Sequence, residues 1–191
     1  MKKIFFGLFF IFLLIKNVSS NEIIVKIEEN WNQIRSMSGE FLQQDPDGNV
    51  SSGKFYFLKP FQSKFHYDNK EEIIITNQSL LRIVDQEGYQ IDSYPIGNNI
   101  LKKLLSEEVS LTKDFDIISI EEENNAYEVT LKLKGEKVEN PLLFLFDRGT
   151  LNLKKWEIYD EFNNKTVLEF TKIKKNIFIS QNLFVVKYKE N

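Results

Sequence analysis

The feature that most constrains this chain is a succession of short β-type runs, divided by turn residues, that recurs from residue 39 to residue 186. The alternation is cleanest over 126–134, where apolar side chains from Tyr127 to Leu133 alternate with polar ones, as on a strand with one buried face. Over 150–160 the apolar phase slips, which predicts a β-bulge near Lys154-Lys155. We therefore predict one antiparallel sheet of about 11 strands. The runs lie at 39–44, 49–58, 63–68, 71–76, 79–84, 88–94, 115–122, 126–134, 141–147, 150–160, 165–173 and 176–186.

Two segments carry a helical spacing of apolar residues instead. Over 22–37, apolar residues from Ile23 to Ile34 recur every three or four positions, and over 98–106 a second apolar cluster lies on one side. Two short helices cannot cover the roughly 30 inward side chains that eleven strands of about six residues present. The sheet must therefore close into a barrel or curl into a concave cup. An apolar cup is suited to an apolar ligand, so we expect a mainly β (α+β) fold with a binding cavity.

Composition removes most kinds of catalytic and metal site. The 191 residues suit one domain, and they include no cysteine and a single histidine, His66. Disulfides, thiolate zinc sites, cysteine nucleophiles and sites that need two imidazoles are therefore excluded. A formal charge of −3 with three arginines argues against a nucleic-acid surface. The sequence also lacks a glycine-rich phosphate loop and the HExxH and GxSxG motifs, so we predict no catalytic residue, no metal and no cofactor.

The first 20 residues have the pattern of an export signal. Lys2-Lys3 precedes an apolar run of 12 residues, Ile4–Ile15, and small residues follow at the −3 and −1 positions of a cleavage site after Ser20. The alternative is a membrane anchor, but the run is shorter than the roughly 20 residues that cross a bilayer. We predict a secretory signal peptide over residues 1–20 and one mature domain over residues 21–191.

The most specific local motif runs from Gly53 to Pro60, with the sequence GKFYFLKP, and an aromatic segment, Phe65–Tyr67, follows it. Taken alone, this is a strand of core aromatics that ends in a solvated lysine and a proline. In this order, however, it resembles the signature of the periplasmic lipoprotein carriers of the LolA family. Further segments resemble that family in the right order along nearly all of 22–186. They are 38–44, which is similar to the family's F-x-Q segment, 73–85, 90–96, 101–105, 151–156 and 162–170.

The resemblance implies a fold, a function and partners. The fold would be an incomplete barrel of 11 antiparallel strands with a lid of two or three short helices. Its cavity would bind the acyl chains of lipoproteins that an inner-membrane LolCDE-type transporter releases into the periplasm. An outer-membrane acceptor such as LolB, where one exists, would then receive the cargo. The protein would be a monomer in the periplasm and not an enzyme.

Roles follow for individual residues. We expect Lys59, which stands where the family often has an arginine, to hold the lid helices through their backbone carbonyls. An ammonium lacks the planar fork of a guanidinium, and a solvated lysine at a strand end is the equally open alternative. The cavity is expected to be lined by Phe41, Phe55, Phe57, Phe65 and Trp156, and the lid to consist of Ile27, Trp31, Ile34, Leu101, Leu104 and Leu105.

Two other functions stay open at this level. A module that senses lipids or lipoproteins could have the same half-barrel, and an added domain or membrane anchor would favour it. A periplasmic enzyme is the third class, but the acidic residues do not single out an acid–base pair. A lone histidine such as His66 in a strand is far more often a packing or surface residue than a catalyst.

Overall fold

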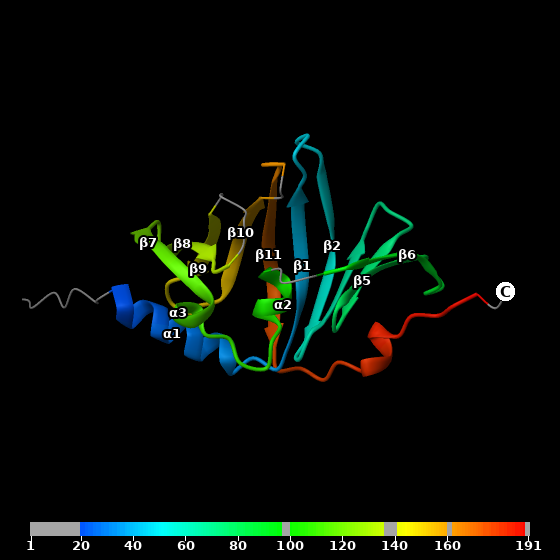
Figure 1. Ribbon diagram of the computed structural model, residues 1–191, viewed down its shortest axis with the longest axis horizontal. Coiled ribbons are helices and arrows are strands. Elements are labelled where there is room, and N and C mark those ends of the chain that lie inside the picture. The colour runs from blue at the N-terminus through cyan, green and yellow to red at the C-terminus, as the bar shows by residue number, and fades with distance from the viewer. Residues whose placement is uncertain (1–19, 97–99, 136–140, 160–161, 190–191) are drawn as a thin grey trace, which may run out of the picture.

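The computed structural model describes residues 20–96, 100–135, 141–159 and 162–189. Eleven strands form one antiparallel sheet in the order β6-β5-β4-β3-β2-β1-β11-β10-β9-β8-β7 (Figure 1). The sheet is open, with β6 and β7 at its two edges. The predicted incomplete barrel of 11 strands with short helices is therefore confirmed. The strands are β1 (Ser36–Gln44), β2 (Val50–Leu58), β3 (Gln62–Tyr67), β4 (Ile73–Asn77), β5 (Leu80–Val84), β6 (Gln90–Pro95), β7 (Phe115–Glu123), β8 (Ala126–Leu133), β9 (Leu142–Asp147), β10 (Leu153–Tyr159) and β11 (Lys165–Lys175).

The sheet consists of two meanders that join in the middle. Strands β1 to β6 pair in chain order, as do β7 to β11, and the pairing of β1 with β11 connects the two halves. In Figure 1, α1 lies below the β7–β10 side and the C-terminal segment runs toward the β5–β6 side. The helices are α1 (Ser20–Asn32), α2 (Ile100–Leu104), α3 (Leu111–Asp114) and the 3₁₀ helix η1 (Gln181–Phe184).

The first helix is shorter than the spacing of its apolar residues predicts. We expected it to reach residue 37, but α1 ends at Asn32 and β1 begins at Ser36, which pairs with Leu58. Ile34 and Met37 are nevertheless buried. The helix does not continue because the ladder between β1 and β2 takes up the backbone groups that a further helical turn would need. The burial of these two side chains therefore does not depend on a helix. The predicted signal peptide lies outside the described residues except for Ser20, where α1 begins.

The last predicted strand, 176–186, is wrong. These residues, all of them described, form an extended segment with η1 inside it. Both edges of β11 are already paired, with β1 and with β10, so the segment that follows it cannot form a hairpin with it. The segment instead places Phe184 on the convex face, in a small cluster with Ile73, Ile75 and Val84.

The predicted bulge on β10 is confirmed, because the register of β10 against β9 shifts between Leu153 and Lys155. At the centre of the sheet, where the register of β1 and β2 is regular, two glycines each face a phenylalanine across the two strands. Gly39 pairs with Phe55, and Gly53 pairs with Phe41. A Cβ at Gly53 would lie 2.2 Å from the carbonyl oxygen of His66. The strands therefore approach one another at a distance that only glycine allows.

The main core fills the concave face of the sheet. Phe55, which is fully buried, contacts the rings of Phe57 and Phe170, with centroids 4.9 and 5.0 Å apart. Apolar residues of α1, among them Ile24 and Ile27, pack into the same cluster. Helix α1 thus covers part of the cup, and α2 and α3 contribute Leu104 and Leu111, respectively, to the same core.

Candidate functional site

A cavity of about 390 Å³ lies on the concave face of the sheet, and strands of both meanders contribute to its wall. Most of its lining is apolar, and none of the described residues that line it is charged. Of the helices in the described ranges, only α2 contributes to the lining. We call this space the concave cavity. Its lining residues are Gln43, Phe65, Tyr67, Ile74, Thr76, Leu81, Ile100, Leu101, Leu133, Leu142, Trp156, Ile158, Tyr159, Thr166 and Leu168.

The aromatic residues predicted for the cavity divide into two groups. Phe65 and Trp156 line the concave cavity. Phe41, Phe55 and Phe57 face the same side of the sheet but are 0–3% exposed within the packed core beside it. Phe57 lies near the end of β2 that meets α1, which explains why the helix side of the cup is filled while the other end is hollow.

The residues predicted for the lid divide in the same way. Leu101 of α2 lines the concave cavity, together with its neighbour Ile100. Leu104, the last residue of the same helix, and Leu105 directly after it are buried in the core. The three lid residues of the first helical segment are buried there as well and do not line the cavity, so α2 covers the hollow part of the cup and α1 covers the filled part. These three are Ile27, Trp31 and Ile34.

The residues predicted for the cavity from the sequence included none of the polar residues that line it. Gln43, Tyr67, Tyr159 and Thr166 lie at the strand ends next to the β1–β2, β3–β4 and β10–β11 connections, and we call them the polar rim. The alternation of β1 could have revealed Gln43, because residues two apart on a strand share a face, and Phe41 faces the core. Nothing in the local sequence of Tyr159 or Thr166 separates them from surface residues.

A hydrogen bond joins two members of the polar rim. The hydroxyl of Tyr67 donates to Oε1 of Gln43 at 2.8 Å. Burial raises the pKa of Tyr67 to about 12, so the phenol keeps its proton at any physiological pH. Deeper in the wall, the buried hydroxyls of Ser63 and Thr76 lie 2.6 Å apart. The polar groups of the lining are therefore neutral and partly paired with each other.

Lys59 contacts the first helix, as its proposed latch role requires. Its Nζ donates to the backbone oxygen of Trp31 at 3.1 Å and lies 5.8 Å from the centre of the indole. Burial lowers the pKa of Lys59 to about 8, and the positive charge of Arg35 adds to this effect. The indole N–H of Trp31 in turn donates to the backbone oxygen of Leu104 at 2.8 Å. A short chain of polar contacts therefore runs from the end of β2 through α1 to α2.

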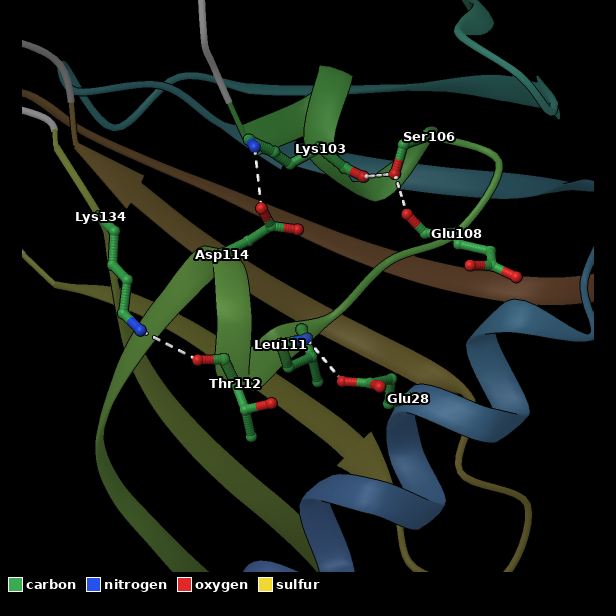
Figure 2. Close-up of polar contacts among 8 residues, drawn as sticks. All are labelled: Glu28, Lys103, Ser106, Glu108, Leu111, Thr112, Asp114 and Lys134. Carbon is green, nitrogen blue, oxygen red and sulfur yellow. Dashed lines mark hydrogen bonds and ion pairs between the residues drawn. The ribbon is translucent and has the colours of Figure 1, made fainter.

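Polar contacts also hold the segment that follows α2 (Figure 2). Nζ of Lys103 lies 2.9 Å from Oδ1 of Asp114, which joins α2 to α3. The backbone N–H of Leu111 donates to the carboxylate of Glu28 at 2.6 Å, which joins the start of α3 to α1. Helix α2 is thus fastened at its C-terminal end, while its Ile100–Leu101 end covers the concave cavity.

The described ranges contain neither a cluster of metal-binding side chains nor a helix that could span a membrane. No group of three or more histidine, cysteine, aspartate or glutamate side chains there is arranged to hold a metal ion. Within the same ranges, none of the helices has the length and apolar character needed to cross a membrane.

Known proteins that are similar to this chain include one relative by sequence and two solved structures. An uncharacterized protein from Rickettsia prowazekii (strain Madrid E) is 27% identical over an alignment of 194 residues, which covers 100% of this chain and 90% of that protein. The crystal structure of an uncharacterized conserved protein from Thermus thermophilus shares the fold, with a TM-score of 0.53, 8% identity and coverage of 90% of this chain and 100% of that one. A LolA-superfamily protein from Nitrosomonas europaea aligns with a TM-score of 0.45 and 11% identity, over 85% and 97% of the two chains.

The family comparison is more specific. The sequence profile of the family described as outer membrane lipoprotein carrier protein LolA matches residues 32–187. This range includes all 11 strands, the Gly53–Pro60 motif and every residue that lines the concave cavity. The chain therefore belongs to the LolA family.

Proposed function

We propose that this protein is a periplasmic carrier that shields the acyl chains of lipoproteins between the inner and the outer membrane. The observation that carries the proposal is the concave cavity: about 390 Å³, mostly apolar and lined by no charged side chain among the described residues. Its volume lies within the range of about 300–1,000 Å³ that is common for small-ligand sites. Membership in the LolA family supports a lipoprotein as the ligand and a carrier rather than an enzyme.

The energetics of acyl chains limit how the cargo is held. A triacylated anchor with about 45 methylenes would gain up to about 35 kcal/mol if every methylene were buried, at about 0.8 kcal/mol each. A carrier with such an affinity could not release its cargo. Because the concave cavity has the volume of one small ligand, we propose partial shielding, in which opening the cup offsets part of the gain.

We assign the opening to α2. The Ile100–Leu101 end would move away from the sheet, and the contacts from Lys59 to Trp31 and from Trp31 to Leu104 would resist this movement. Phe65 and Trp156 would contact an acyl chain in the present state. The three buried phenylalanines predicted for the cavity would come within reach only in a more open state. These are Phe41, Phe55 and Phe57.

A release assay tests the proposal. The mature protein is incubated with spheroplasts or with vesicles that contain a LolCDE-type transporter, and lipoprotein in soluble complexes is measured. We expect release with the natural chain and a strong loss with Leu101→Glu, which places a charge in the cavity wall. Ile91→Glu, at a position of β6 that is 59% exposed, is the matched control and should keep activity.

The same assay separates the carrier from the alternative function. Absence of soluble lipoprotein complexes with a folded protein would contradict the carrier proposal. Lipoprotein binding without transfer to outer-membrane vesicles that contain an acceptor such as LolB would instead favour a sensing module. If the lipoprotein is transferred to these vesicles, the result supports both the acceptor and the transporter as partners.

A further inference from the structure

We propose that the side-chain amide of Gln43 donates a hydrogen bond to the carbonyl of an ester- or amide-linked acyl chain in the concave cavity. The inference rests on the proposed function and adds to it a specific recognition element. It means that the cavity distinguishes acyl groups from plain alkyl chains of the same length.

The position of Gln43 suits such a contact. Gln43 lies directly opposite Leu168 on β11, and Leu168 lies opposite Trp156 on β10, so the three side chains form one row across the wall of the cavity. Apolar residues such as Phe65 and Ile74 continue the wall from there. An acyl chain that packs along this apolar wall can therefore place its carbonyl at the polar rim.

The hydrogen bond between Tyr67 and Gln43 decides which end of the Gln43 side-chain amide is available to a ligand. Oε1 of Gln43 accepts the Tyr67 hydroxyl at 2.8 Å, and Tyr67 is 6% exposed. The amide nitrogen of Gln43 carries two N–H donors, and neither has a hydrogen-bond partner within the described part of the chain. Gln43 is half-buried at the polar rim, so water reaches its side chain in the empty cavity.

Filling the cavity with hydrocarbon would remove that water and leave an amide donor unpaired, which is costly in an apolar site. A carbonyl oxygen at the same place restores the hydrogen bond. The acceptor is neutral, because none of the described lining residues carries a charge that would balance a buried anion. Lys70 lies 4.5 Å from the centre of the Tyr67 ring but does not line the cavity. An ester or an amide carbonyl fits this environment.

Displacement of a neutral apolar dye, N-phenyl-1-naphthylamine, tests the inference with three competitors below their micellar concentrations. They are a diacyl phospholipid, its dialkyl ether analogue with the same chains and headgroup, and a triacylated lipopeptide. For the natural chain we expect the ester to bind about five-fold more tightly than the ether, as one hydrogen bond allows. Gln43→Leu should bring this ratio close to one and weaken the lipopeptide by a similar factor. Gln44→Leu makes the same change at the next residue of β1, which is exposed and does not line the cavity, and it should leave the ratio unchanged.

The outcomes separate this inference from the function on which it rests. Equal affinity of ester and ether for the natural chain would overturn the carbonyl contact without the need for any variant. An equal loss of both in Gln43→Leu would overturn it too, because a structural role of Gln43 does not depend on a carbonyl. If none of the competitors displaces bound dye, the acyl cavity itself is refuted. A Gln43-dependent ratio for phospholipid without an effect on the lipopeptide would support the contact and overturn the lipoprotein as its source.

Discussion

The hydrogen bond between the Trp31 indole and α2 gives the sharpest test of the fold. The indole N–H donates to the backbone oxygen of Leu104 at 2.8 Å, and Trp31 is 5% exposed. Trp31→Phe keeps an aromatic ring but leaves a buried carbonyl without its partner, which costs about 1–3 kcal/mol. The smaller ring also loses packing contacts. The same substitution at the second tryptophan, Trp156, measures this packing loss separately.

Trp156→Phe is the matched control. Trp156 is 3% exposed, and its indole N–H has no hydrogen-bond partner within the described residues. Replacing Trp156 by phenylalanine removes the same atoms from the same core without breaking a hydrogen bond. We therefore expect Trp31→Phe to lower the free energy of unfolding by about 2 kcal/mol more than Trp156→Phe does. For a chain of this size the difference in Tm is about 4–8 °C.

The assay is urea unfolding followed by tryptophan fluorescence. The sequence contains two tryptophans, so each variant keeps one reporter in the core. Hydrogen exchange adds local information: the amide of Leu105, bonded to the oxygen of Leu101 at 3.0 Å, should exchange faster in Trp31→Phe alone. If Trp31→Phe is no less stable than Trp156→Phe, the indole bond does not hold α2 and the proposed restraint on opening is refuted.

Three further predictions concern the latch, the close approach of the central strands and the C-terminal segment. Because burial lowers the pKa of Lys59 to about 8 while the unfolded chain keeps the proton up to about 10.5, the free energy of unfolding should rise from pH 8 to pH 10.5. Lys59→Met should lessen this rise in urea titrations at the two pH values, and an unchanged slope would contradict the assignment. Gly53→Ala places a Cβ 2.2 Å from a backbone oxygen and should destabilise by about 3 kcal/mol or prevent folding, whereas Gly149→Ala, whose nearest contact is 3.6 Å, should be close to neutral in the same measurement. Phe184→Ala empties a site that is 1% exposed, which should cost about 3–5 kcal/mol and expose the C-terminal segment to limited proteolysis; equal protease resistance would show that Phe184 does not anchor the segment.

Local patterns were sufficient for much of the fold. Alternation along 126–134 and the phase slip at Lys154-Lys155 predicted a strand and a bulge, because side-chain direction in a strand depends only on adjacent residues. The number of inward side chains expected from the strands exceeded the number that two short helices can cover, and this difference predicted a cup. Such a number can be counted from the sequence without knowing the contacts. The Gly53–Pro60 motif carried the resemblance to the family.

The tertiary structure decided how the cup is filled. Phe57 and Phe65 have the same local pattern, but α1 closes over the end of the sheet that holds Phe57 and leaves a hollow beside Phe65. The pair of Gln43 and Tyr67 joins residues 24 positions apart, so no local pattern contains it. The segment 176–186 has the alternation of a strand, yet both edges of β11 are occupied before it can pair. Periodicity determines which face a side chain takes, whereas the covering of that face depends on segments that the chain brings from far away.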